Sequence, residues 1–74
     1  MTSKEFIERA TLAIKEISPG YEVHLVWYSK SLQNFKGMFC QLSPDNDYYE
    51  ITYNGDKQEM YLDKYVKVFN KVVD

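Results

Sequence analysis

The sequence predicts a single α+β domain over residues 1–74, in which an N-terminal and a C-terminal helix pack on one face of a small antiparallel sheet of three to four strands. Two observations predict this class. Apolar residues recur every three to four positions near both ends of the chain, as in amphipathic helices. Between these ends they alternate every two positions, as in half-buried strands. A chain of 74 residues provides one small domain.

The first helix is predicted over residues 3–17. Thr2 and Glu5 have the spacing of a capping box, and the Ser-Pro-Gly segment at 18–20 ends the helix because proline cannot continue it. One side of this helix is apolar and consists of Phe6, Ile7, Ala10, Ala13, Ile14 and Ile17.

Three strands are predicted next, over residues 21–28, 35–42 and 48–53. The polar segments 29–34 and 43–47 between them have the composition of turns. The alternation assigns one side of each strand to the core, and we expect this side to hold Tyr21, Val23, Leu25, Trp27, Met38, Cys40, Leu42, Tyr49, Ile51 and Tyr53.

The end of the chain has two interpretations. The Asn-Gly dipeptide at 54–55 is a strong hairpin signal because both residues tolerate positive φ, and it favours a short fourth strand at 57–62 before a helix over 63–72. In the second interpretation the helix already begins at residue 57, with Asp56 and Glu59 as its capping box. The apolar stripe of the final helix would be Leu62, Tyr65, Val66, Phe69, Val72 and Val73.

If both helices cover one face of the sheet, the opposite face is exposed to solvent. The alternation predicts an apolar and aromatic set on this exposed face, namely His24, Val26, Tyr28, Phe39, Tyr48 and Thr52. The first turn and its flanks add a mixed aromatic and polar rim, consisting of Tyr28, Lys30, Gln33, Asn34, Phe35 and Lys36. Except for Thr52, these residues are our candidates for binding a partner.

Composition limits the compartment and the partner. The formal net charge of -2 removes the usual electrostatic argument for nucleic-acid binding. Cys40 is the only cysteine, so no intramolecular disulfide can form, and we expect a buried thiol in a reducing cytosol. We find neither a signal peptide nor the run of about 18 apolar residues that spans a bilayer. We therefore expect a soluble, cytoplasmic protein with no membrane partner.

No residue pattern indicates catalysis. His24 is the only histidine, and the predicted alternation places it on the opposite face from Cys40, out of reach for a Cys–His nucleophile pair. The acidic segment 45–50 lacks the glycine and the length of a calcium loop. The three glycines are scattered singly, so no phosphate-binding loop is present. We expect no enzymatic activity, no cofactor and no metal.

Protein binding is the function that these residues favour, because exposed aromatic side chains with polar neighbours form interface hot spots. Trp27 is expected in the core, whereas Tyr28 and Phe35 are expected to contact a partner. An equally physical interpretation is a homodimer, in which a second copy covers the apolar sheet face.

Nucleic-acid binding is the alternative. Exposed sheet aromatics with Lys30 and Lys36 have the composition of a base-stacking platform, and the α-β-β-β-α order is that of double-stranded RNA-binding domains. Those domains need lysines at the start of the last helix, where this chain has Asp56, Glu59 and Asp63.

Two segments, VWYSKSLQNFKG and YYEITYNGDKQEMYLDKYVK, resemble a family of small uncharacterised phage and prophage proteins of Gram-positive bacteria, a domain of unknown function. Its pattern is V-W-x-x-K-x-L-Q-N-x-K followed by Y-Y-E-x-T-Y-N-G-D-K. The resemblance implies phage origin and the host cytoplasm, and it implies no activity and no site residues. We therefore expect a phage-encoded accessory protein that binds a protein stoichiometrically, with a host or defence-system component as target and inhibition as one outcome.

Overall fold

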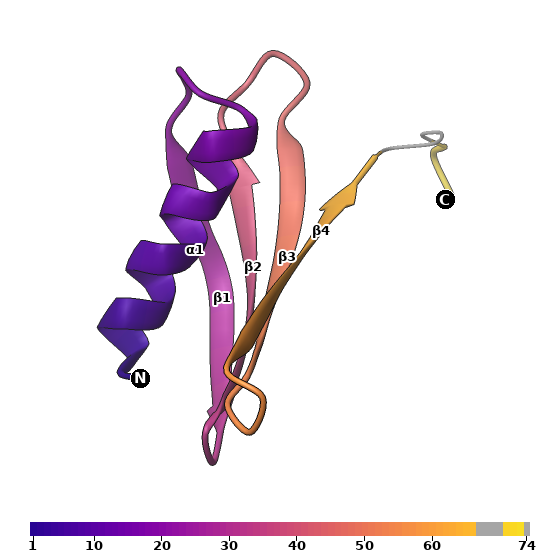
Figure 1. Cartoon of the computed structure of the whole chain (residues 1–74). Coiled ribbons are helices and arrows are strands. Elements are labelled where there is room, and N and C mark those ends of the chain that lie inside the picture. Colours follow the sequence, from indigo (N-terminus) through magenta and orange to yellow (C-terminus); the bar gives the residue numbers. More distant parts are fainter. Residues whose placement is uncertain (67–70, 74) are drawn as a thin grey trace.

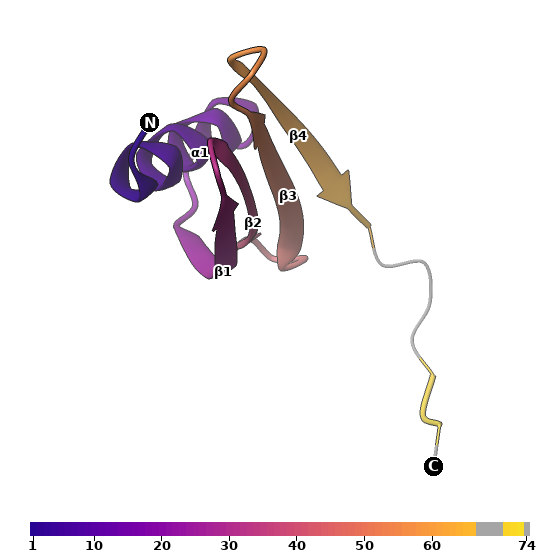
Figure 2. The same ribbon diagram turned by 90° about the horizontal axis from the view of Figure 1, so that it is seen from below.

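The computed structural model describes residues 1–66 and 71–73. It consists of helix α1 (Ser3–Ile17) and strands β1 (Val23–Ser31), β2 (Asn34–Gln41), β3 (Asp47–Asn54) and β4 (Glu59–Tyr65). The strands form one antiparallel sheet in the order β1-β2-β3-β4, and α1 lies on one side of it (Figures 1 and 2). The predicted α+β class is confirmed.

Helix α1 begins and ends where the sequence predicts. The Glu5 N–H donates to the Thr2 hydroxyl at 3.1 Å and the Thr2 N–H donates to the Glu5 carboxylate at 3.0 Å, so the capping box is present. At the other end, the Ser18 N–H donates to the carbonyl of Ile14 at 2.9 Å. Gly20 follows with φ of 94°, a conformation that favours glycine.

The core lies between α1 and the middle of the sheet. Phe6, Ala10 and Ile14 are fully buried along α1. The ring of Phe6 stacks on Phe35, with 5.0 Å between the ring centroids. A Cβ atom on Gly37 would lie 3.2 Å from the Phe6 ring, so the glycine leaves room for the helix to approach. The strands contribute Phe35, Phe39, Tyr49, Ile51 and Tyr53.

The predicted orientation of β2 is wrong. Phe39 is fully buried on the α1 side, whereas Met38 is half-buried on the opposite face. Both sides of this strand are apolar, so its period of two does not determine which side faces the helix. Packing determines it, because Phe35 and Phe39 lie on either side of Gly37 and both contact the ring of Phe6.

Strand β1 contains a β-bulge. Leu25 pairs with Phe39, and the next pair along the two strands is Trp27 with Met38. Val26 therefore has no partner on β2 and is the extra residue. The extra residue inverts the alternation beyond this point, because successive side chains of a strand point to opposite faces. Trp27 therefore lies on the face opposite α1, and its predicted place in the core is wrong.

The bulge also places Tyr28 and Lys30 on the α1 side, in register with β2 residues of that side, so the predicted exposed-face position of Tyr28 is wrong. The Lys30 ammonium lies 5.5 Å from the centroid of the Phe35 ring, a cation–π contact. Tyr21 and Leu42, which were predicted in the core, lie outside the strands and are exposed.

Strand β3 has the predicted orientation, since Tyr49, Ile51 and Tyr53 are buried. The β3–β4 hairpin is confirmed, but its loop has four residues, 55–58, instead of a two-residue Asn-Gly turn. Gln58, with φ of 53°, takes the positive φ of this loop.

Strand β4 replaces the beginning of the predicted C-terminal helix. The strand pairs with β3 through Tyr65, so both helical interpretations are wrong here. Residues 71–73 have no regular secondary structure, and residues 67–70 of the predicted helix lie outside the described part of the chain. The apolar spacing of this segment fits a helix, but pairing with β3 satisfies its backbone groups and half-buries Met60 and Leu62.

Candidate functional site

The candidate site is the sheet face opposite α1, which we call the open face. Its members follow from the register, because residues directly paired across antiparallel strands lie on the same face. Across the four strands it includes His24, Trp27, Ser29, Lys36, Met38, Cys40, Tyr48, Glu50, Thr52, Glu59, Tyr61, Asp63 and Tyr65.

Aromatic side chains dominate the open face. Trp27, the only tryptophan, is 45% exposed there, and Tyr48, Tyr61 and Tyr65 are each close to half exposed. Trp27 reaches this face through the bulge in β1 and lies opposite Met38. A lone domain rarely exposes so many large apolar groups on one face, so this surface is suited to contact with another molecule.

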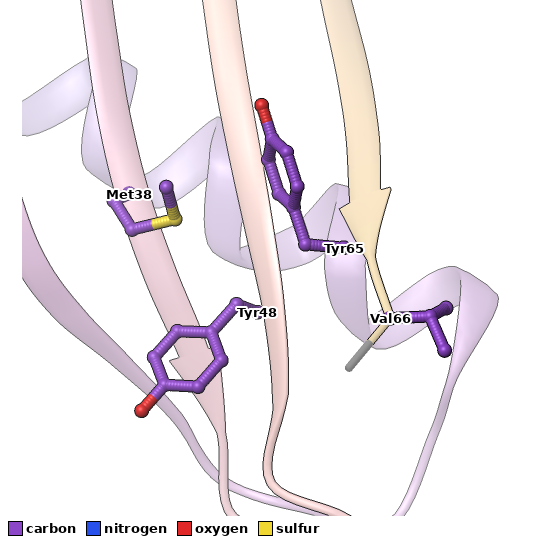
Figure 3. A pocket seen from close by; sticks show the side chains of 4 residues that line it. All are labelled: Met38, Tyr48, Tyr65 and Val66. Atoms are coloured by element: carbon purple, nitrogen blue, oxygen red, sulfur yellow. The ribbon is translucent and has the colours of Figure 1, made fainter. Parts of the chain in front are cut away.

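An apolar depression of about 450 Å³ lies at one end of the open face (Figure 3). Tyr48 and Tyr65 form its sides, since they are paired in register across β3 and β4. Met38 and Val66 complete the lining. Trp27 lies next to the depression, because it pairs with Met38, one of the lining residues.

The charged groups of the open face are mainly acidic. Glu50 and Asp63 are paired directly across β3 and β4, so two acidic residues occupy neighbouring positions on this face. The Lys36 ammonium lies 3.7 Å from the Glu50 carboxylate. Within the described residues Asp63 has no ion-pair partner, and Glu59 adds a third carboxylate at the end of β4.

The hydroxyl of Tyr61 donates a hydrogen bond to the Glu59 carboxylate two residues before it on β4. This hydrogen bond raises the pKa of Tyr61 above its ordinary value, because it stabilises the protonated phenol. Tyr61 therefore presents a neutral ring with an oriented hydroxyl.

The structure separates the residues that the sequence proposed for partner binding. His24, Lys36 and Tyr48 lie on the open face, and Val26 is exposed in the bulge. Phe35 and Phe39 are buried in the core, so their predicted exposure is wrong. Trp27 and Met38 were missed because the sequence predicted them on the core side of their strands. Tyr65 was missed because it was predicted in a C-terminal helix, and Tyr61 was missed because the end of the chain had no settled interpretation.

Gln33 and Asn34, also proposed for binding, join the two hairpin loops at one end of the sheet. The side-chain oxygen of Asn34 accepts from the Gly55 N–H at 2.9 Å, and the Gln33 amide donates to Asp56. A Cβ atom at position 55 would overlap Gln33. The segments Leu-Gln-Asn and Asn-Gly-Asp are therefore in contact, which gives both a structural role.

His24 and Cys40 are direct neighbours on the open face, so the prediction that they face opposite sides is wrong. Reversal of β2 brings Cys40 to this face, where it is half-buried. The Nε2 atom of His24 lies 3.2 Å from the Glu22 carboxylate. In residues 1–66 and 71–73, no group of three or more potential metal ligands is present.

Comparison with known proteins gives one match. The sequence model described as Family of unknown function (DUF6275) matches residues 2–74. No curated protein and no solved structure matches the chain. Among the described residues, no helix is long and apolar enough to cross a membrane.

Proposed function

The chain belongs to the family of unknown function DUF6275, and from its open face we propose that it acts by stoichiometric binding of one protein partner. The observation that supports this most strongly is the position of Trp27. The bulge in β1 places the only tryptophan on the open face, next to a depression lined by two half-exposed tyrosines. Tryptophan and tyrosine are the residues most enriched in interface hot spots.

The biological setting of this proposal is a phage-encoded accessory protein in the host cytoplasm. It is supported by the resemblance of the two segments around 26–36 and 48–67 to phage and prophage proteins. The target would then be a host or defence-system protein. We propose binding without catalysis, because the exposed aromatic groups provide contact area and the rest of the face adds charges for orientation.

Nucleic acid is the second candidate partner, because half-exposed rings on a sheet stack bases. The charges of the open face argue against it. Glu50, Glu59 and Asp63 would repel phosphates, and Lys36 is already paired with Glu50. Salt dependence distinguishes the two, since phosphate contacts weaken steeply with added salt whereas apolar contacts do not.

Affinity capture with the tagged chain from a Gram-positive lysate, with and without nuclease treatment, tests the proposal. A Trp27→Ala/Tyr65→Ala variant removes two anchors of the open face. Leu12→Ala is the matched control, because Leu12 is 66% exposed on α1, on the other side of the sheet. We expect the wild type and the control to retain one protein in stoichiometric amount, and the double variant to retain at least tenfold less.

Equal capture by all three forms would show that the open face is not the binding surface. Capture that disappears after nuclease treatment would favour the nucleic-acid alternative. Melting temperatures of the three forms establish that each is folded.

A further inference from the structure

The central row of the open face places two acidic residues at directly paired positions. Trp27, Met38, Glu50 and Asp63 are paired in sequence across the four strands. Like charges directly opposite each other destabilise a sheet. The ammonium group of Lys36 partly neutralises the charge of Glu50. Asp63, on the neighbouring strand β4, is exposed to solvent.

Aromatic rings flank this pair along β4. Tyr61 and Tyr65 lie two residues before and after Asp63, on the same face, and therefore about 7 Å away along the strand. Both residues are close to half exposed, so part of each ring is accessible to a ligand. Asp63 thus lies between two exposed tyrosines of β4, and Glu50 and Asp63 lie next to the residues that line the apolar depression, Met38, Tyr48 and Tyr65.

This combination matches one side chain. The guanidinium group of arginine is planar, donates two parallel hydrogen bonds to carboxylates and stacks on aromatic rings, and its hydration is weaker than that of an ammonium group. We propose that the partner inserts an arginine over Glu50 and Asp63, between Tyr61 and Tyr65. Apolar residues next to that arginine would cover Trp27 and Met38. This inference rests on the proposed function and specifies the chemistry of the partner.

Charge complementarity favours this occupant over two others. A second copy docked face to face would bring the carboxylates of two open faces into one interface. Nucleic acid would bring phosphates to the same carboxylates. A protein segment with arginine and apolar residues instead brings a positive charge to Glu50 and Asp63.

Selection of a phage-displayed random dodecapeptide library on the immobilised whole chain tests the inference. Peptides that also bind Trp27→Ala/Tyr65→Ala are removed, which restricts the selection to the open face. We expect the retained peptides to share an arginine next to aromatic or aliphatic residues. Each peptide is then synthesised with arginine and with citrulline, which has the same shape without the charge.

Affinities of both peptides for the wild type and for Asp63→Asn complete the test. We expect citrulline to weaken binding at least tenfold and Asp63→Asn to weaken the arginine peptide at least fivefold, while the citrulline peptide responds little to Asp63→Asn. Open-face peptides without arginine, or peptides insensitive to Asp63→Asn, would overturn the arginine anchor and leave the proposed function in place. Failure to select any peptide specific for the open face, together with no capture from lysate, would overturn both.

Sedimentation of the chain alone tests whether a second copy of the chain occupies the open face. A dimer that dissociates on Trp27→Ala would assign the open face to a second copy and overturn the inference. A monomer supports a different partner.

Discussion

The phenol of Tyr49 donates a hydrogen bond to the side-chain oxygen of Gln41 at 3.4 Å, in the core of the protein. The Gln41 amide in turn donates to the carbonyl of Ser18 at 2.6 Å. Gln41 is the fully buried polar side chain that links β3, β2 and the end of α1. Its donor and acceptor are both used, as expected of a buried amide.

We expect Gln41→Leu to lower the free energy of unfolding by about 1–3 kcal/mol, because it leaves the Tyr49 hydroxyl and the Ser18 carbonyl without this partner. Tyr49→Phe removes only the longer of the two hydrogen bonds, so its effect is expected to be smaller, about 1 kcal/mol. Urea unfolding of both variants measures the difference. A larger loss for Tyr49→Phe would contradict this assignment.

Trp27→Ala is expected to change the stability little, because the ring is 45% exposed and lies outside the core cluster. Phe39→Ala, on the neighbouring strand, should lower the free energy of unfolding by about 3–5 kcal/mol through loss of buried contacts and a cavity. Denaturant titrations of both variants test which residues of β1 and β2 face the core. If Trp27→Ala were the more destabilising change, the bulge in β1 would be wrong.

Gly55→Ala is expected to destabilise the fold by about 1–3 kcal/mol, because the added methyl group overlaps Gln33 in the other hairpin loop. A Cβ atom at Gly20 meets nothing within 4 Å, so Gly20→Ala tests backbone strain alone, at a cost of about 1–2 kcal/mol. Thermal unfolding compares them. The closest overlap is with the backbone carbonyl oxygen of Gln33, which every substitution at position 33 retains, so Gly55→Ala/Gln33→Gly should be no more stable than Gly55→Ala. An unchanged melting temperature of Gly55→Ala would show that the two loops do not touch.

Asp63→Asn is expected to raise the free energy of unfolding by about 0.2–1 kcal/mol, because it removes a like charge opposite Glu50. Added salt should reduce the difference from the wild type, since it screens the repulsion. Chemical denaturation at low and high salt measures both effects. A destabilised variant would indicate that Asp63 has a favourable partner in the folded chain.

The hydrogen bond from the backbone N–H of Thr2, followed by that of its side chain, lowers the pKa of Glu5. A lowered pKa stabilises the folded state above the unfolded pKa, and this contribution is lost as the pH falls through the folded pKa. NMR titration of the Glu5 carboxyl should therefore give a lower midpoint in the folded chain than in urea. Thr2→Val should move the folded midpoint upwards, and an unchanged midpoint would contradict the capping assignment.

Much of the candidate surface was beyond sequence analysis. The sequence placed His24 and Tyr48 on the sheet face opposite α1, because the alternation was assigned correctly before the bulge in β1 and along β3. Lys36 also lies on this face, although the orientation of its strand, β2, was predicted wrongly. It missed Trp27, since one inserted residue at Val26 inverts every later position of the strand and leaves no trace in the composition. It missed Tyr61 and Tyr65, since their apolar spacing fits a helix as well as a strand.

By itself, the sequence determined those features that depend on neighbouring residues. These are the capping box of α1, Gly20 after the end of α1, the orientation of β3 and the presence of the final hairpin. Each depends on local backbone preferences or on the alternation of apolar residues within one strand. Tertiary structure decided which face of β2 meets the helix, where β1 bulges and whether the last segment pairs with β3. These choices depend on contacts between distant residues, above all Phe6 with Phe35 and Phe39, and local periodicity does not determine such contacts.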